Sequence, residues 1–279
     1  MPFVATPEQV KAFQAFSHRP GFSQEVISVD FVTTEDFVRS VLPPGLEPAS
    51  KPVGTVSIST WESRLCGEFE CTMVSLQATV NGVEGKYILT LIVSGDMPVT
   101  WGREIWGEVK KTGTSQLYRS GTRRFGYGER KGVRLVELAA DFTTDLPPNT
   151  EEGLGYEIKA YPSSTGIGLH GDPRLVTLRI VDNNATRATG KGKMVLRGTK
   201  SDPLHEIPIL SIGDFTYVSG VTDYTVQSET PMEVGDRYLP YLIGRHYDDL
   251  RLFRIADDFD RGEQEEEEEA FPVQRLVSP

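Results

Sequence analysis

The chain has 279 residues, 38% of them hydrophobic, and its 40 acidic and 29 basic residues give a net charge of −11. This length and hydrophobic content are enough for a full core, whereas the acidic balance disfavours nucleic acid and anionic membrane surfaces as partners. The two cysteines, Cys66 and Cys71, and the four scattered histidines form no zinc or disulfide pattern. Without a visible secretory leader or a long apolar run, the chain is expected to be cytoplasmic.

Two short helices are predicted near the N-terminus. Thr6, Pro7 and Gln9 supply an N-cap, a proline at the first helical position and a capping-box partner. Apolar residues at helical spacing then predict a helix that ends near His18. A second helix is expected over residues 33–42, with a stop signal at the prolines and glycine that follow.

Strands dominate after residue 52, where the apolar period changes from that of a helix to strict alternation over residues 53–61. Residues 73–80 and 86–93 flank Asn81-Gly82, a pair that tolerates positive φ, and therefore predict a hairpin. The abundant turn formers, 27 glycines and 18 prolines, also favour many short elements. Further strand-like runs are 133–142, 156–161, 175–181, 192–197 and 215–218, with residues 190–193 interpreted as a turn.

These elements predict a mainly β fold: a single large antiparallel β-barrel or cone-like domain with a few short helices. Closure is expected because so many strands would otherwise expose edges. The boundaries predicted are an N-terminal helical arm at 1–20, the β domain at 21–256 and a tail at 257–279. Nine acidic residues against two arginines give that tail a charge of −7, typical of a solvated, disordered segment.

The segment 102–111 carries the most informative motif, Gly-Arg-Glu followed closely by the pair Lys110-Lys111. It resembles the signature of the acetoacetate decarboxylase family. Segments at 42–47, 81–87, 156–162 and 204–209 also fall in the order of that family, so the resemblance spans roughly residues 25–225. It implies a cofactor-independent lyase that acts on a small-molecule keto acid and assembles as a homo-oligomer.

By this resemblance Lys110 would be the amine that condenses with a substrate ketone. The protonated imine draws electrons from the adjacent carbon, so loss of CO2 gives a neutral enamine. An ordinary lysine amine has a pKa of about 10.4, and acetoacetate decarboxylase is itself a known example of a lysine activated by desolvation or by a neighbouring cation. The non-catalytic alternative is that Lys110 and Lys111 are a solvated pair on the surface.

Strand geometry favours desolvation over the neighbouring cation. If residues 106–111 are extended, Lys110 and Lys111 point to opposite faces, whereas Trp106 and Glu108 share the face of Lys110. Trp106 and other apolar pocket residues would then supply most of the desolvation, with Lys111 as a secondary electrostatic helper. Arg103 is expected, together with the next residue of the signature, Glu104, to position the lysine segment or to form a structural ion pair.

The pattern departs from the family at several positions, including Gln24 in place of an arginine and Val56-Ser57 in place of an earlier pocket glutamate, and two departures fall on candidate site residues. Cys71 stands where a glutamate is expected on the strand before the hairpin, although Glu70 or Glu68 could serve after a shift of one residue. Glu108 stands where the decarboxylase has an aromatic residue. Its carboxylate would favour the ammonium form of Lys110, or it could replace the missing glutamates as the proton donor or acceptor.

Three hypotheses follow. The first is a decarboxylase of a β-keto acid, either acetoacetate or a larger polyketide-derived acid of secondary metabolism. Lys110 would be its nucleophile, and Glu70, Glu68 or Glu108 would donate or accept protons. The second keeps the imine but changes the reaction to aldol condensation and dehydration. The third is a barrel that only binds a small apolar ligand.

Overall fold

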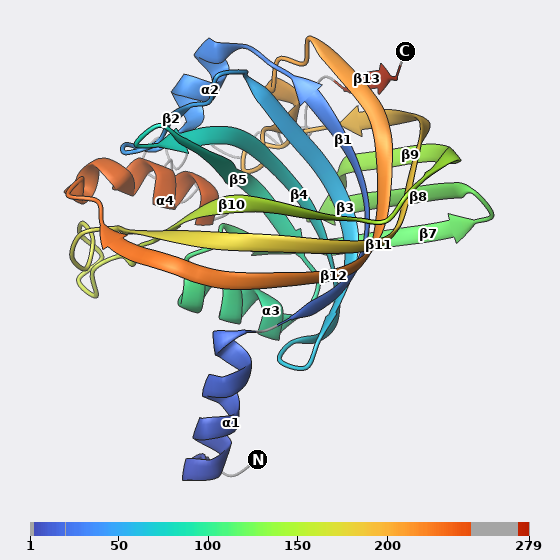
Figure 1. The fold of residues 1–279 in the computed structure, drawn as a ribbon. Helices are drawn as coiled ribbons and strands as arrows, with labels where there is room; N and C mark the ends of the chain where they lie inside the picture. Colours follow the sequence, from blue (N-terminus) through green and yellow to red (C-terminus); the bar gives the residue numbers. More distant parts are fainter. Residues whose placement is uncertain (1–2, 20, 247–272, 279) are drawn as a thin grey trace, which may run out of the picture.

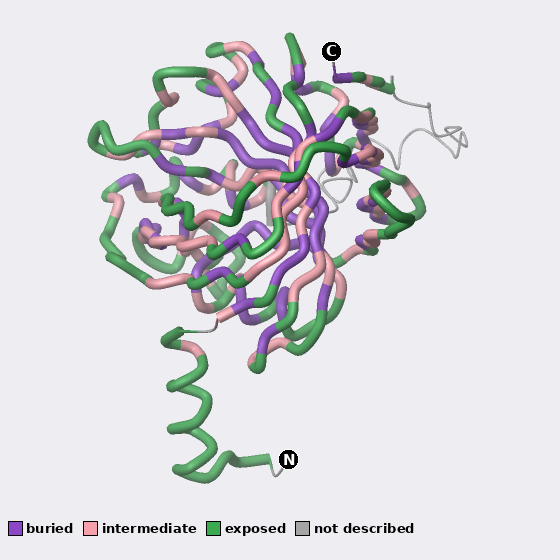
Figure 2. The backbone as a smooth tube through the Cα atoms, turned by 45° about the vertical axis from the view of Figure 1, so that its right-hand side comes forward, coloured by how far each residue is buried: buried purple, intermediate pink, exposed green. Residues whose placement is uncertain are grey.

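The first two helices begin where their capping residues predict. In α1 (Pro7–His18), the Thr6 side chain accepts from the Gln9 amide and the Gln9 side chain accepts from the Thr6 amide. In α2 (Glu35–Val41), the Thr34 hydroxyl accepts from the Phe37 amide, and the helix ends before the prolines. α1 buries none of its residues and projects away from the body of the molecule (Figures 1 and 2).

The structure is a computed structural model that describes residues 3–19, 21–246 and 273–278. Among these residues the strands are β1 (Phe22–Val32), β2 (Glu47–Pro48), β3 (Val53–Ser63), β4 (Gly67–Val80), β5 (Val83–Val93), β6 (Lys110–Thr112), β7 (Thr114–Ser120), β8 (Arg123–Arg130), β9 (Val133–Leu146), β10 (Asn149–Lys159), β11 (Arg174–Leu196), β12 (Ser211–Pro231) and β13 (Gln274–Val277). The remaining helical elements are α3 (Asp96–Trp101), η1 (Gly102–Trp106), η2 (Leu204–Glu206), η3 (Gly235–Tyr238) and α4 (Leu239–His246).

Seven strands close into a barrel in the order β10, β5, β4, β3, β1, β12, β11 and back to β10. β9, β8 and β7 extend the sheet from β11 and pack over β3 and β4 (Figure 1). The predicted mainly β, closed and predominantly antiparallel fold is thus confirmed. The closure itself uses a short parallel pairing, in which Gly155 and Tyr156 of β10 lie beside Lys86 and Tyr87 of β5.

The predicted hairpin and the predicted turn at residues 190–193 have different outcomes. Asn81 and Gly82, at φ 51° and 78°, connect β4 directly to β5. Residues 190–193 instead lie inside β11, so the runs 175–181 and 192–197 belong to one long strand. A Cβ on Gly190 would overlap the backbone of Asp141 on β9. This glycine therefore permits close strand approach, and the prediction of a turn is wrong.

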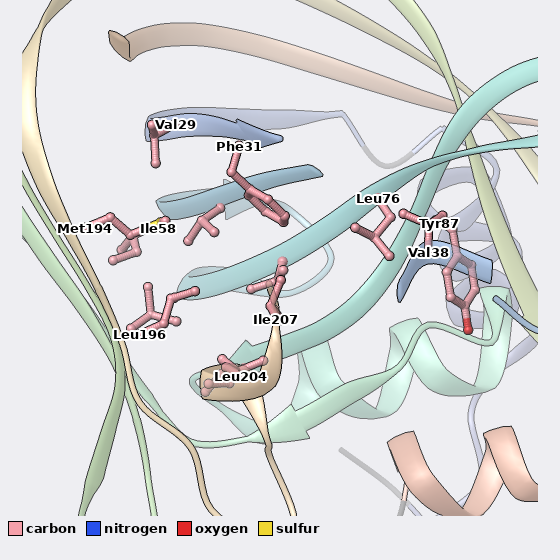
Figure 3. Close-up of a cluster of buried hydrophobic side chains, with 14 of the residues drawn as sticks. Val29, Phe31, Val38, Ile58, Leu76, Tyr87, Met194, Leu196, Leu204 and Ile207 are labelled. Carbon is pink, nitrogen blue, oxygen red and sulfur yellow. The ribbon is translucent and has the colours of Figure 1, made fainter. Parts of the chain in front are cut away.

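Two clusters of buried hydrophobic side chains stabilise the barrel. The main core includes Leu76 and Tyr87 from the hairpin, Met194 and Leu196 from β11, and Leu204 of η2 (Figure 3). The second core consists of Phe22, Phe69, Cys71, Leu91, Val93, Val99, Trp101, Trp106, Val109, Val176 and Leu178. Leu91 and Val93 belong to the second core and Ile92 to the main core, so the two clusters lie on opposite faces of β5.

The predicted disordered tail at 257–279 requires a correction at its end. Residues 257–272 lie outside the described residues, but β13 pairs antiparallel with β11. Leu276 packs against the main core, and the Gln274 side chain donates to the carbonyls of His205 and Ile207. These contacts explain why this segment is an ordered strand. In the described part of the chain, no helix is both long and apolar enough to cross a membrane.

Candidate functional site

The segment with the Gly-Arg-Glu motif forms a π-helical turn rather than a strand. α3 continues directly into η1, and Gly107 ends the turn in the left-handed conformation at φ 84°. The amides of Gly107 and Glu108 both donate to the Gly102 carbonyl, at 3.0 and 3.2 Å. A single π turn within a helix is frequently found at a functional site. Trp106 is therefore helical, and the expected extended conformation over residues 106–111 is correct only from Lys110 onward.

β6 then sends the two lysines to opposite faces of the sheet. β6 pairs parallel with β5, so that Lys110 lies beside Leu91 and Lys111 beside Ile92. Leu91 belongs to the second core and Ile92 to the main core. This is the opposite-face arrangement that alternation predicts.

The Lys110 amine is buried beside a carboxylate. Lys110 is 6% exposed, and its Nζ lies 2.7 Å from Glu108 Oε2, with Glu108 itself 8% exposed. The amine also lies 5.9 Å from the centroid of the Phe69 ring. A Cβ on Gly102 would overlap the Glu108 carboxylate, so the glycine of the motif makes room for the pair. Two groups predicted for the site are thus in direct contact.

Aromatic rings surround this pair. Trp106 contacts Trp101 edge-on, with a centroid separation of 4.3 Å, and Tyr224 at 5.4 Å. Trp61 stacks on Phe69 at 6.5 Å, and Phe22 contacts Trp61, Phe69 and Tyr224 edge-on. The rings come from β1, β3, β4, α3, η1 and β12, so barrel closure brings them together. They provide an apolar environment for a substrate and exclude water from the amine.

Glu157 is a second carboxyl group on this side of the barrel. In β10 it lies opposite Val176 of β11, a residue of the second core, and it is 2% exposed. Burial raises the pKa of Glu157 well above its ordinary value, and the nearby Glu108 carboxylate raises it further, while Lys110 opposes the rise. Glu157 therefore favours its protonated form, in contrast to an exposed glutamate.

Cys71 and Tyr224 complete the polar groups of the site. The Cys71 sulfur lies 3.1 Å from both the Trp61 indole nitrogen and the Ser59 hydroxyl. Burial raises the pKa of the Cys71 thiol. Burial also raises the pKa of the Tyr224 phenol well above its ordinary value, with further contributions from Asp182 and Glu108. Both groups are thus neutral at neutral pH and can act as hydrogen-bond donors.

Lys111 belongs to a separate buried ion network. Its Nζ lies 3.0 Å from Asp202 Oδ1 and donates to the Ser201 carbonyl at 3.1 Å. Arg130 donates to the other oxygen of Asp202 at 2.5 Å. Lys111 lies on the face opposite Lys110, and its charge is compensated by Asp202. This placement gives it a structural role that the sequence did not indicate.

Three other predicted residues have different surroundings: Glu70 on the other face of β4, and Arg103 and Glu104 in a hollow beside η1. On β4, Glu70 occupies the face opposite Phe69 and Cys71, and its carboxylate accepts from the Ser94 hydroxyl at 2.7 Å. Arg103 and Glu104 line a hollow of about 390 Å³ between η1, α3 and α4, and Lys110 is not among its lining residues. Tyr161, another lining residue, donates its hydroxyl to the Glu104 carbonyl. Trp106 and Cys71, by contrast, lie in the second core with the aromatic rings.

Neither Glu157 nor Tyr224 stands out in the sequence as a site residue. Glu157 lies between Tyr156 and Ile158 in a predicted strand, a position where alternation suggests a solvent-facing side chain. The available signal was an acidic residue flanked by large apolar ones. Tyr224 lies beyond the last predicted strand run, and nothing local distinguished it. Among the described residues, no group of three or more histidine, cysteine, aspartate or glutamate side chains is placed to hold a metal ion.

The fold and the site together define a class: a mainly β barrel that encloses a lysine–carboxylate pair among aromatic rings. The family model for acetoacetate decarboxylase (ADC) matches residues 1–232, and the chain belongs to the acetoacetate decarboxylase family. The resemblance seen in the sequence is thereby confirmed.

Known relatives share the fold at low sequence identity. Acetoacetate decarboxylase 3 of Mesorhizobium japonicum is 27% identical over 47% of this chain, and the match spans only 59% of that relative. The acetoacetate decarboxylase of Legionella pneumophila superposes with a TM-score of 0.67 at 18% identity, covering 76% of this chain and 86% of that one. The enduracididine biosynthesis enzyme MppR, complexed with the condensation product of pyruvate and imidazole 4-carboxaldehyde, has a TM-score of 0.65 at 20% identity, covering 79% and 90%.

Proposed function

We propose that this protein is a cofactor-independent carboxy-lyase that forms an imine between Lys110 and the ketone of a β-keto acid. The observation that carries the proposal is the buried amine of Lys110, held 2.7 Å from Glu108 among aromatic rings. Membership of the acetoacetate decarboxylase family supports an enzyme of this kind. We further propose a cytoplasmic homo-oligomer whose partner is a small-molecule keto acid rather than nucleic acid or membrane.

In this mechanism Glu108 accepts the proton of the Lys110 ammonium and later returns it. The Lys110 ammonium transfers a proton to Glu108 along the short contact, and the neutral amine attacks the ketone carbon. The resulting carbinolamine takes that proton on its hydroxyl, and water leaves to give the iminium ion. The bond to the carboxylate then breaks, its electrons form the enamine, and CO2 departs.

The aromatic rings favour a substrate with an apolar or aromatic group beside its ketone. Phe22, Trp61, Phe69, Trp106 and Tyr224 offer ring faces and edges to such a group. Loss of CO2 also removes a negative charge from surroundings that solvate it poorly, which drives the reaction forward. These features support a larger keto acid of secondary metabolism over acetoacetate.

Aldol condensation with dehydration is the second candidate reaction. It shares the imine, and Cys71 in place of the family glutamate is the observation that favours it. The MppR structure with a condensation product shows that a protein of this fold accommodates such a compound. Product analysis separates the two: one CO2 per turnover supports decarboxylation, whereas water loss with carbon–carbon bond formation and no CO2 supports the alternative.

The test is trapping of the imine with borohydride. The protein is incubated with acetoacetate or 5-phenyl-3-oxopentanoate, reduced, digested and mapped by peptide mass spectrometry, while released CO2 is measured in parallel. We expect an adduct on Lys110 that Lys110→Met abolishes. The control Lys11→Met changes an exposed lysine of α1 and should leave the adduct intact. If no keto acid or ketone modifies Lys110, the chain is better described as a ligand-binding barrel.

A further inference from the structure

The carboxyl group of Glu157 lies on the same side of the barrel as the ion pair but takes no part in it. Its neighbour across the β10–β11 ladder is Val176 of the second core. A Cβ on Gly107 would overlap the backbone of Ile158 and Lys159, so the chain just before Glu108 runs directly against β10. The two carboxyl groups are therefore brought to one site from segments about fifty residues apart.

The Glu157 carboxyl group also has no structural interaction with the described residues that would explain its burial. It is 2% exposed, the ion pair of Lys110 is made with Glu108, and the Glu157 carboxyl group makes no hydrogen bond with the other described residues. A buried polar group without a partner costs free energy and calls for an explanation. Burial and the Glu108 charge raise the pKa of Glu157, so it keeps a proton that the ion pair does not require.

We propose that Glu157 is the acid that returns a proton to the reacting carbon after CO2 has left, an inference that rests on the imine chemistry proposed above. In this role Glu157 substitutes for the family glutamate, whose position on β4 is occupied by Cys71. Glu70, the sequence alternative, points to the other face of β4 and is bound to Ser94. Glu157 is thus the carboxyl group that the structure places with the amine in addition to Glu108.

Glu157 supplies the proton of the new C–H bond. The enamine carbon takes the proton from Glu157, its π electrons form the new C–H bond, and the nitrogen lone pair restores the iminium. Water then adds its oxygen to the iminium carbon and gives a proton to the Glu157 carboxylate, which returns to its starting form. As the carbinolamine collapses, its hydroxyl proton moves to the nitrogen, the C–N bond breaks and the ketone leaves Lys110. The neutral amine then takes one proton from solvent, which is the proton that decarboxylation of a keto-acid anion consumes.

The experiment separates imine formation from proton transfer at carbon. The protein is incubated in D2O with 4-phenyl-2-butanone, and deuterium exchange of the methyl protons is followed by NMR while borohydride trapping reports the Lys110 adduct. We expect Glu157→Gln to form the adduct within about 3-fold of the wild-type rate and to lose exchange by about 100-fold, the scale of a general acid–base contribution. Glu152→Gln, an exposed carboxyl group on the same strand, is the matched control.

Each outcome decides between the two proposals. Glu157→Leu removes the buried polar group altogether and should show the same loss if the glutamine variant folds poorly. Exchange at the wild-type rate in either folded variant overturns the role of Glu157 and leaves the imine intact. Absence of any adduct in the wild-type protein overturns the imine proposal and this inference with it. Loss of adduct and exchange together in both variants also contradicts a role confined to carbon protonation.

Discussion

Three ionisable side chains, those of Lys110, Glu108 and Glu157, occupy buried positions where hydrophobic side chains would make the protein more stable. Each is under 10% exposed. Taking charges out of water has a cost that pairing in a low dielectric only partly offsets, and replacing a buried pair by apolar residues is often neutral or stabilising. Stability therefore does not explain this group of residues. The proposed chemistry explains it, because an imine-forming amine needs one carboxylate to move the proton on nitrogen and one acid to protonate carbon.

The pH dependence of stability tests the protonation state of Glu157 without any substrate. A glutamate in the unfolded chain has a pKa of about 4.3, and the folded pKa of Glu157 is raised by burial. Its contribution to stability is therefore fully present below about pH 4.3 and is lost as the pH rises towards the folded value. We expect Glu157→Gln to become progressively more stable relative to wild type as the pH rises above about 4.3.

This difference is measured by urea unfolding of both proteins at matched pH. The other carboxyl groups titrate in both, so the difference isolates Glu157, apart from its interaction with Glu108 and Lys110. A difference that stays constant above this pH would show that Glu157 is ionised in the folded protein. Glu152→Gln again serves as the control, because Glu152 is exposed and paired with Arg179.

The π-helical turn η1 is the element that sets the geometry of the pair. Gly102 has ordinary helical dihedral angles, so alanine suits its backbone, but the added Cβ would meet the Glu108 carboxylate and the Lys110 amine. We expect Gly102→Ala to slow formation of the Lys110 adduct by about 100-fold, the effect of a displacement of about 1 Å at a reacting group. Overpacking should also lower the free energy of unfolding by about 1–3 kcal/mol.

A glycine with free space around it provides the comparison for this variant. Gly153 of β10 has no atom within 4 Å of a Cβ placed on it. Gly153→Ala should therefore change neither the trapping rate nor the unfolding midpoint measurably. Trapping of Gly102→Ala at the wild-type rate would show that the pair tolerates displacement.

Local elements could be predicted from the sequence, whereas their partners could not. The opposite faces of Lys110 and Lys111 follow from alternation alone, and so does the Asn81-Gly82 hairpin. The Lys111–Asp202 pair joins residues 91 apart in the sequence, and no local pattern reports it. Glu157 and Lys159 are two residues apart on β10 and so lie on the same face of that strand. Glu157 is buried only because the barrel closes and the backbone at Gly107 approaches β10. Glycines 190 and 192 suggested a turn because close strand approach and a turn both select glycine.

At the scale of the whole molecule, barrel closure assembles the site. The Lys110 amine comes from β6, which lies beside β5, and β5 also pairs with β10, the strand of Glu157. The β5–β10 pairing is short, while the β10–β11 ladder extends along the whole of β10. The position of Glu157 relative to Lys110 is therefore fixed by β11 on one side and by the η1 segment on the other.

α1 lies outside this closed body and has an apolar stripe without a partner among the described residues. Val10, Phe13 and Phe16 are 45%, 42% and 38% exposed, and a projecting amphipathic arm is suited to contact a second copy of the chain. We expect deletion of residues 1–19 to leave the Lys110 adduct intact and to shift the melting temperature by about 2 °C or less, because exposed residues contribute little to stability. Light scattering should show a smaller assembly for the truncated protein, and Phe13→Glu should reproduce that loss. An unchanged mass in both variants would show that other surfaces join the subunits.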